Sequence, residues 1–532
     1  MARILVADAV AQEGIDFLRE RHDVEVSTGL SEDALVEAVR GRDALIVRSQ
    51  TQVTARVIAA ADRLSVIGRA GVGVDNIDLD AATQHGVIVV NAPLANTLST
   101  AEHTFGLMLA LARNTPQAYA SLRAGKWERN RFMGIELAGK TLGIIGLGRI
   151  GTEVARRARA FEMRVIAFDP FVSRDRGSQL GVEMTELEPL LATSDFVTLH
   201  TALHEGSRGM INAERLALAK HGVRIINAAR GALIDEQALY DAVESGQVAG
   251  AAIDVFSVEP AVGNILTTHD RIVVTPHLAA STYEAQDRAA LDVAEQVADV
   301  LDGGTARFAV NAPLLDPETM AVLGPYIDAA EVAGNVAMQL SGGGVQRVRV
   351  EYLGDIANYD STPLHAGVIV GMLQRVTSEK VTIVNAKRLA EEHGLRIDEE
   401  TGPARDPYAN LVVVHAMLDD GGEESVAVTH TGSGLRVVGI GPYPVEVARA
   451  TPYLVAIENI DRPGMIGRVG TLLGKLGVNI AHMSVAGGPG GLALMVLCIQ
   501  RLLNADELTE VAALEDLHSV RQIDLSVTRP AT

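Results

Sequence analysis

Residues 141–151 read TLGIIGLGRIG, an apolar run that passes directly into a glycine-rich turn. The apolar run predicts a β-strand, and residues 151–161 predict the helix that follows it. Glycines let the backbone of such a turn approach a pyrophosphate closely, and the N-terminus of the helix attracts its negative charge. The pattern therefore predicts a dinucleotide-binding turn. Its residues are Gly146, Gly148, Arg149, Ile150 and Gly151.

Asp169 ends the next predicted strand, near the spacing of about 20 residues expected for the acid that binds a ribose 2′-hydroxyl. A carboxylate there repels a 2′-phosphate, so the sequence favours NAD over NADP. Residues 134–141, GIELAGKT, also match the phosphate-binding pattern GxxxxGK[ST]. That match precedes a strand instead of following one, so we reject ATP binding.

Working outward from the turn, strand-like runs alternate with helical stretches through residues 1–100 and again through residues 141–301. This alternation predicts two doubly wound parallel sheets with helices on both faces, an α/β fold of Rossmann-like domains. Residues 312–450 carry β-like runs and glycine-rich breaks, which predict an α+β domain. Residues 451–532 read strand, helix, strand, strand, helix, strand, the ferredoxin-like βαββαβ order.

Composition sets broad limits on the class of protein. At roughly 150 residues per domain, 532 residues predict three or four domains. The net charge of −21 argues against binding of nucleic acid or anionic lipid. No apolar run approaches the roughly 18 residues of a membrane span. The single cysteine, Cys498, fits a reducing compartment such as the cytoplasm, and the sequence predicts no metal site.

Chemistry-bearing side chains follow three successive predicted strands. The segments are Asn227–Gly231 (NAARG), Asp254–Pro260 (DVFSVEP) and Thr275–His277 (TPH). Ligands of open α/β sheets bind beyond the carboxyl ends of strands, so all three segments are expected to line one cleft. Singly, an Arg, Glu or His in such a place is more often structural. Together, Arg230, Glu259 and His277 match the needs of hydride transfer on a hydroxy acid, because they supply a carboxylate-binding cation and a His with an acidic partner.

These motifs closely resemble those of the D-isomer-specific 2-hydroxyacid dehydrogenase family. GLGRIG, Asp169, NAARG, AIDVFSVEP and TPHLAAST occur in the family's order and spacing. The segments VRS at 47–49, GRAGVGVDN at 68–76 and KWER at 126–129, with the βαββαβ tail, resemble the long branch of the family that oxidises 3-phosphoglycerate in serine biosynthesis. The tail is similar to an ACT regulatory domain.

The resemblance implies a role for each matching residue. His277 would be the acid/base, Glu259 its partner, and Arg230 the ligand of the substrate's carboxylate and reacting oxygen. Further cofactor-binding positions would be Asp254 at the nicotinamide amide, Thr201 nearer the adenosine, and Ala229.

For the substrate, Arg48 and Arg69 would face its phosphate and carboxylate, and Asn76 would support their pocket. Arg129, from the segment KWER, would reach the site of a neighbouring subunit.

The resemblance also implies a domain layout. Residues 1–98 and 284–311 would form a discontinuous substrate-binding domain around an NAD-binding domain at 99–283. An intervening regulatory domain at 312–450 and the ACT domain at 451–532 would follow. The ACT domain would bind L-serine as an allosteric effector through Asn459, Asp461 and Asn479, and the chain would form a homotetramer by analogy.

Two alternatives remain open at this point. The chain could be a glyoxylate, hydroxypyruvate or other D-2-hydroxyacid reductase with the same catalytic core, or a non-catalytic NAD sensor. Two departures from the family pattern concern fine positioning. Ala279 replaces the glycine of HLGAST, and Glu162 occupies a glycine position where positive φ is common, so we expect strain or a reshaped loop there.

Overall fold

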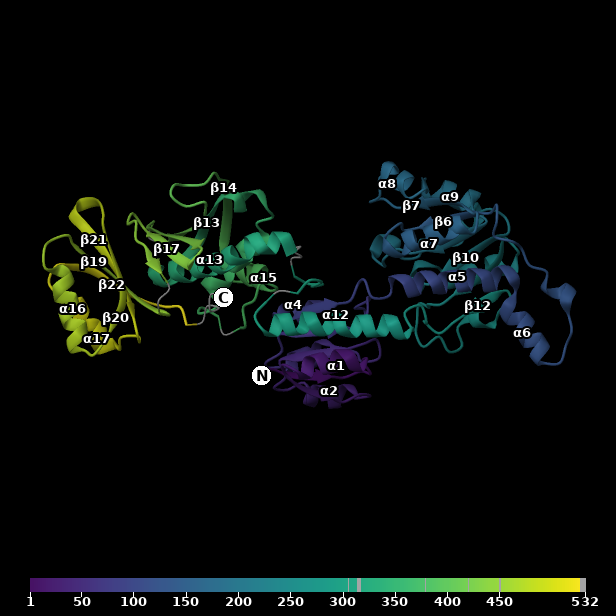
Figure 1. The fold of residues 1–532 in the computed structure, drawn as a ribbon, viewed down its shortest axis with the longest axis horizontal. Coiled ribbons are helices and arrows are strands. Elements are labelled where there is room, and N and C mark those ends of the chain that lie inside the picture. Colours follow the sequence, from purple (N-terminus) through teal and green to yellow (C-terminus); the bar gives the residue numbers. More distant parts are fainter. Residues whose placement is uncertain (305, 313–316, 378, 420, 449–450, 527–532) are drawn as a thin grey trace.

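The protein is described by a computed structural model that covers residues 1–304, 306–312, 317–377, 379–419, 421–448 and 451–526 (Figure 1). Four sheets follow one another along the chain, each with its own helices. The first two are parallel, the third is mixed and the fourth is antiparallel. This confirms the predicted fold class. The boundary expected between residues 450 and 451 falls beside residues 449–450, which lie outside the described residues.

The first sheet has the strand order β2-β1-β3-β4-β5, a doubly wound arrangement. The long helix α12 returns from residue 283 to pack on this sheet, where Val293 and Val297 lie in its core. This unit is therefore built from two separate stretches of chain. Its strands are β1 Arg3–Val6, β2 Asp23–Val26, β3 Ala44–Val47, β4 Val66–Arg69 and β5 Ile88–Asn91. Its helices are α1 Gln12–Arg19, α2 Glu32–Ala38, α3 Ala55–Ala60, α4 Leu79–Gln84 and α12 Tyr283–Leu301.

The second sheet runs β12-β11-β10-β9-β6-β7-β8. The strand order reverses between β6 and β9, which is the crevice where dinucleotides bind in this fold. Its strands are β6 Thr141–Ile145, β7 Arg164–Phe168, β8 Glu183–Met184, β9 Phe196–Leu199, β10 Val223–Asn227, β11 Val248–Ile253 and β12 Ile272–Val274. Its helices are α5 Thr97–Arg113, α6 Thr115–Arg123, α7 Arg149–Ala160, α8 Arg174–Gln179, α9 Leu187–Thr193, α10 Ala213–Leu218 and α11 Glu236–Glu244.

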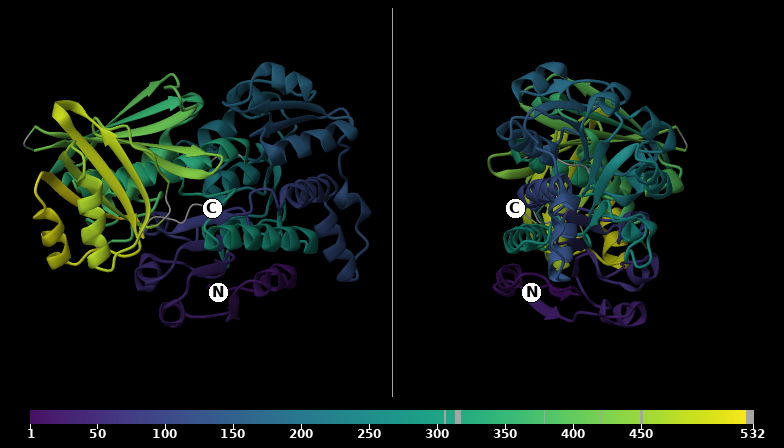
Figure 2. Two further views of the ribbon diagram at one scale, coloured as in Figure 1. Left: turned by 60° about the vertical axis from the view of Figure 1, so that its left-hand side comes forward. Right: turned by 90° about the vertical axis from the view of Figure 1, so that its right-hand side faces the viewer.

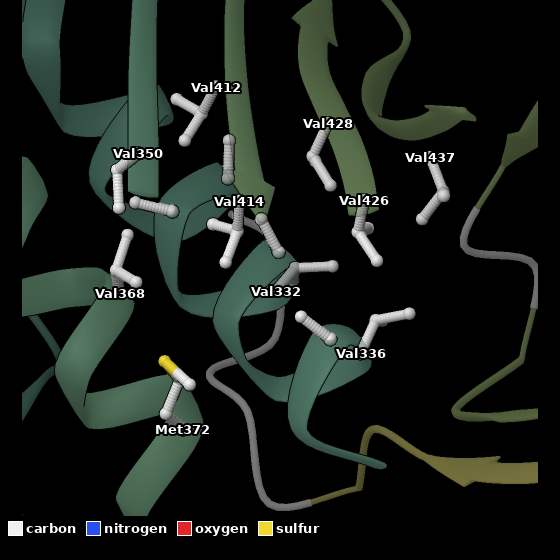
Figure 3. Packing of buried hydrophobic residues seen from close by; sticks show 14 of the residues in the cluster. Val332, Val336, Val350, Val368, Met372, Val412, Val414, Val426, Val428 and Val437 are labelled. Carbon is white, nitrogen blue, oxygen red and sulfur yellow. The ribbon is translucent and has the colours of Figure 1, made fainter. Parts of the chain in front are cut away.

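The third unit packs two long apolar helices against one face of a six-stranded sheet. Figure 3 shows Val332 and Val336 of one helix and Val368 of the other near the valines of the strands, while Met372 of the second helix lies against the first helix at Gly334. The helices are α13 Pro317–Ser341, α14 Thr362–Leu373 and α15 Ala386–Glu392. The strands are β13 Val345–Gly354, β14 Arg396–Gly402, β15 Asn410–Leu418, β16 Glu423–Thr431, β17 Gly434–Ile440 and β18 Val447–Ala448.

The last unit is the expected βαββαβ module, with the strand order β20-β21-β19-β22. Its elements are β19 Tyr453–Ile460, α16 Met465–Lys475, β20 Ile480–Gly487, β21 Leu492–Ile499, α17 Ala505–Ala512 and β22 Leu517–Asp524. One face of its sheet joins the hydrophobic core of the third unit, and Cys498 is fully buried there. Figure 2 shows these two units side by side at one end of the molecule.

Both departures from the family pattern are accommodated locally. Glu162 has φ 58°, so a side chain occupies the left-handed region that glycine usually fills, as the sequence suggested. Ala279 is buried in the core of the second unit. Within the described residues, no helix is long and apolar enough to cross a membrane. No group of metal-ligating side chains occurs among them either.

Candidate active site

The glycine-rich turn lies at the carboxyl end of β6, where Gly146 has φ 94°. A β-carbon on Gly151 would lie 2.1 Å from the carbonyl oxygen of Gly146, so only glycine allows this close packing of strand and helix. A β-carbon on Gly148 would meet no atom within 4 Å. The backbone around Gly148 and Arg149, at the exposed N-terminus of α7, is therefore open to a ligand.

Asp169 lies beside this turn and is held by two backbone amides. Its Oδ2 accepts from the N–H of Leu147 at 2.8 Å, and its Oδ1 accepts from the N–H of Phe171 at 2.9 Å. The carboxylate is thus fixed at the edge of the open turn. On the other side, a β-carbon on Gly146 would lie 3.0 Å from the backbone nitrogen of Thr201. The turn, Asp169 and Thr201 fit a dinucleotide that carries a free ribose 2′-hydroxyl.

His277 and Glu259 form a close pair between the loops that follow β12 and β11. His277 Nδ1 lies 2.8 Å from Glu259 Oε2, and the other oxygen, Oε1, accepts from the N–H of Phe256 at 3.0 Å. Because Nδ1 faces the carboxylate, Nε2 is the nitrogen left to exchange a proton with a substrate. His277 has φ 54°, a strained conformation for a residue other than glycine.

Asp254 keeps the His277 loop in that conformation. Its carboxylate is fully buried and accepts from Thr275 Oγ1 at 2.5 Å, Leu278 N at 2.8 Å and Ala279 N at 2.9 Å. Burial raises the pKa of Asp254, but hydrogen bonds from His103, Thr275 and Leu278 outweigh it and hold this pKa below its ordinary value. Here Asp254 organises the loop, and its expected contact with a nicotinamide amide stays a prediction.

Arg230 projects from the end of β10 toward the first unit. Its Nε lies 3.4 Å from Asp75 Oδ2, and a β-carbon on Gly73 would lie 2.4 Å from its guanidinium. Gly231, the next residue, lies so near Phe256 that a β-carbon would be 1.9 Å from its carbonyl carbon. Ala229 is fixed by the side chain of Asn227, which accepts from its N–H at 3.0 Å. The two parallel-sheet units therefore meet at Arg230.

Arg69, at the end of β4, completes a cluster of guanidinium groups with Arg48 and Arg230. Burial first, and then the charges of Arg230 and Arg48, lower the pKa of Arg69 to about 10. Its Nε is buried without a hydrogen-bond partner among the described residues. Asp75 and Asp8 oppose the repulsion only in part. A multiply charged anion bound here would relieve it.

Two further side chains shape this cluster. The Asn76 amide donates to the carbonyl oxygens of Arg48 at 2.7 Å and Thr51 at 2.6 Å. The buried carboxylate of Asp8 accepts from the N–H of Arg48 at 2.6 Å and from Thr51 Oγ1 at 2.7 Å. Sequence reasoning missed Asp8, Asp75 and His103. For Asp8, the one available signal was an acid at the end of a strand.

The other predicted residues lie apart from this cleft. Arg129 is exposed in a 3₁₀ helix, Arg129–Phe132, that follows α6 at the end of the molecule far from the βαββαβ module (Figure 1). Asp461 and Asn479 are exposed at the ends of β19 and β20. Asn459 is buried and donates to the carbonyl of Ile460 at 2.7 Å. Its side chain therefore braces the turn, which leaves Asp461 and Asn479 as the accessible members of the predicted effector set.

Family models match three parts of the chain. Residues 105–279 match the D-isomer specific 2-hydroxyacid dehydrogenase NAD binding domain, residues 322–440 the D-3-phosphoglycerate dehydrogenase intervening domain, and residues 453–516 the ACT domain. Among solved structures, the D-lactate dehydrogenase of Aquifex aeolicus, complexed with NAD and lactic acid, has a TM-score of 0.53 at 28% identity. A glyoxylate reductase from Paecilomyes thermophila has a TM-score of 0.54 at 32% identity. Each covers 58% of this chain, and the chain covers 99% and 98% of them respectively.

Curated relatives match along the whole length. The D-3-phosphoglycerate dehydrogenase of Archaeoglobus fulgidus is 42% identical over 98% of this chain and 100% of its own. That of Bacillus subtilis is 41% identical over 99% of this chain and 100% of its own. The fold and the site thus define an NAD-dependent oxidoreductase of the 2-hydroxyacid dehydrogenase class. With the intervening and ACT domains in place, the chain belongs to the D-3-phosphoglycerate dehydrogenase family.

A partly buried histidine beside the glycine-rich turn, His200, is expected to make the second unit sensitive to acid. His200 Nδ1 has no hydrogen-bond partner among the described residues, and burial lowers the pKa of His200 to about 3. Because this pKa lies below the unfolded value of 6.5, folding stability is full above pH 6.5 and is lost as pH falls toward 3. Between pH 7.5 and pH 5 the His200 contribution amounts to about 2 kcal/mol, at about 1.4 kcal/mol per pH unit.

We predict that His200→Gln reduces the fall in melting temperature between pH 7.5 and pH 5, measured by thermal unfolding. The control is His221→Gln, which changes an exposed histidine of the same unit and keeps the wild-type fall. An equal fall in all three proteins would contradict the assignment to His200.

Proposed function

We propose that this enzyme oxidises 3-phospho-D-glycerate at C2 to 3-phosphohydroxypyruvate with NAD, the first step of L-serine biosynthesis. The observation that carries the proposal is the cluster of Arg48, Arg69 and Arg230, in which Arg230 follows β10, a neighbour in the sheet of the strands that precede Glu259 and His277. A small acid with a carboxylate at one end and a phosphate at the other matches such a cluster. The full-length relatives that are named D-3-phosphoglycerate dehydrogenase support this choice of substrate.

In the proposed mechanism, Arg230 binds the substrate carboxylate and the C2 oxygen, and so holds the hydroxyl toward His277 Nε2. His277 takes the hydroxyl proton on Nε2, and Glu259 stabilises the imidazolium through Nδ1–H. Arg48 and Arg69 hold the phosphate. The turn at Gly146 and the carboxylate of Asp169 would hold NAD, which would accept the hydride that leaves C2. The strained loop at His277 and the buried Asp254 keep the imidazole aligned before substrate arrives.

The alternative of an unphosphorylated hydroxyacid reductase shares the catalytic pair. It leaves much of the repulsion at Arg69 without an opposing charge, because a substrate such as glyoxylate or hydroxypyruvate brings only one negative charge. The NAD-sensor alternative assigns no chemical role to the His277–Glu259 pair.

We also propose a cytoplasmic location, as the lone Cys498 suggests.

We expect His277→Gln to lower kcat by about 10²- to 10⁴-fold, the usual contribution of a general base. Arg230→Ala should lower kcat/KM by about 10²-fold or more, because it removes charge-assisted hydrogen bonds to substrate. The measurement is NADH formation from 3-phosphoglycerate by purified protein. His221→Gln is the matched control and should behave as wild type. Turnover near wild type in either active-site variant would refute the assigned roles.

Regulation and assembly form a second part of the proposal. We propose that the ACT domain binds L-serine through Asp461, which pairs with the ammonium group, and Asn479, which bonds across a paired-domain interface. We also propose a homo-oligomer, a tetramer by analogy, in which Arg129 reaches a neighbouring active site. The exposed Trp127 and Met133 on the same segment, each 79% exposed, support an interface there.

Calorimetry on the full chain tests the effector site. L-serine should bind the wild type and lower its activity, and Asp461→Asn should weaken this binding at least about 10-fold, as expected for loss of one charge-assisted bond. Asp506→Asn, an exposed acid of the same domain, is the control and should leave binding unchanged. Absence of serine binding to the wild type would overturn this part of the proposal.

A further inference from the structure

A segment of the intervening domain docks on the substrate-binding domain, next to the strand that ends in Arg69. The Lys380 ammonium donates to the carbonyl of Leu64 at 3.2 Å and to Ser65 Oγ at 2.9 Å. Thr382 Oγ1 donates to the carbonyl of Gly86 at 3.2 Å. The side chains of Asn385 and Arg388 both donate to the carbonyl of Gln84, at 3.4 Å and 3.0 Å. In Figure 1, the helix of this segment, α15, lies beside α4.

This contact is built from both sides. Asn385 is 1% exposed and braces the segment, because its Oδ1 accepts from the N–H of Thr382 at 2.8 Å and its Nδ2 donates to the carbonyl of Lys380 at 2.8 Å. On the facing domain, a β-carbon on Gly86 would lie 2.8 Å from Thr382 Oγ1. The fit therefore requires glycine at residue 86. Burial lowers the pKa of Lys380, and the nearby charge of Asp43 opposes that effect.

The groups that the segment contacts lead directly to the arginine cluster. Leu64 and Ser65 precede β4, a buried strand whose last residue is Arg69, about 13 Å away at 3.3 Å per residue. Gln84 and Gly86 precede β5, which is paired with β4 so that Asn91 lies opposite Arg69. Asn91 Nδ2 in turn donates to the carbonyl of Val72 at 2.5 Å. The segment thus holds the amino ends of the two strands whose carboxyl ends shape the anion pocket.

We infer that residues 380–388 of the intervening domain are a positioning element for Arg69, and that their docking tunes the affinity of the active site for the phosphorylated substrate. The strands transmit the position of their amino ends because each is short, buried and paired along its length. The identity of the ligand rests on the proposed function. The role of the segment in holding the loop of residues 69–76 does not.

The chain just before the docking segment contacts the ACT domain. Arg375, five residues before Lys380, pairs with Asp524 at the end of β22 at 2.7 Å. The backbone of Asp524 exchanges hydrogen bonds with the side chain of Gln339 on α13, at 2.9 Å and 3.0 Å. A change at the ACT domain therefore has a short covalent path to Lys380, which gives the positioning element a means of regulation.

The test uses full-length Lys380→Met, which keeps the apolar stem of the side chain and removes the ammonium. We expect KM for 3-phosphoglycerate to rise about 5-fold, in the range of residues that act on a site from outside it, while kcat and KM for NAD stay near wild type. Lys380→Arg should recover most of the loss. Lys387→Met changes an exposed lysine of the adjoining helix α15, on the same segment, and should match wild type.

Amide hydrogen exchange, followed by mass spectrometry, provides a readout that needs no substrate. Peptides covering residues 66–76 should exchange faster in Lys380→Met than in wild type or Lys387→Met. Ser65→Ala removes one acceptor from the opposite domain and should shift both readouts in the same direction. Failure of the wild type to oxidise 3-phosphoglycerate would overturn the proposed function. The amide exchange of residues 66–76 would then be the measurement that tests the positioning role. The inference would be overturned if Lys380→Met changed neither KM for 3-phosphoglycerate nor amide exchange. It would also be overturned if KM rose equally for 3-phosphoglycerate and for NAD.

Discussion

Electrostatic repulsion among Arg48, Arg69 and Arg230 is the constraint on which the cleft depends. Like charges near a partly buried guanidinium are costly, and they persist only where surrounding structure holds them or a ligand offsets them. Here the holding groups are carboxylates behind the cluster: Asp8 fixes the Arg48 loop, and Asp75 faces Arg230 from the other domain. The pocket is thus prepared for an anion before one arrives.

The two parallel sheets explain how residues so far apart in sequence share this cleft. Each sheet presents the carboxyl ends of its strands to the other, so β4 delivers Arg69 while β10 and the segments after β11 and β12 deliver Arg230, Glu259 and His277. Asp254 has a role on its sheet comparable to that of Asp8, because each is a buried carboxylate that fixes the loop carrying a functional side chain. The arginine cluster, the His277–Glu259 pair and the glycine-rich turn therefore lie on separate loops that follow separate strands.

Sequence reasoning succeeded where the signal was local. The turn at residues 146–151 predicts the second sheet, and the order of strands and helices in residues 451–532 predicts the βαββαβ module. It missed the helices α13 and α14. In the case of α14, the helix is apolar on every side and so lacks the period that reveals a surface helix. It also missed Asp8, Asp75 and His103. The partners of Asp8 lie 40 or more residues away along the chain. Those of Asp75 and His103, which are Arg230 and Asp254, lie on other elements. Asn459 is buried by tertiary packing that no local pattern records, and its expected contact with an effector stays a prediction.

We propose that the arginine cluster selects a substrate with two anionic groups. The most direct test of this proposal compares kcat/KM of the wild-type enzyme for 3-phospho-D-glycerate and D-glycerate, which differ only in the phosphate. We expect a preference of at least about 100-fold for the phosphorylated acid, because the contacts to Arg48 and Arg69 that D-glycerate lacks are charge-assisted hydrogen bonds worth about 1.5–3 kcal/mol each. Equal values for the two acids would contradict it.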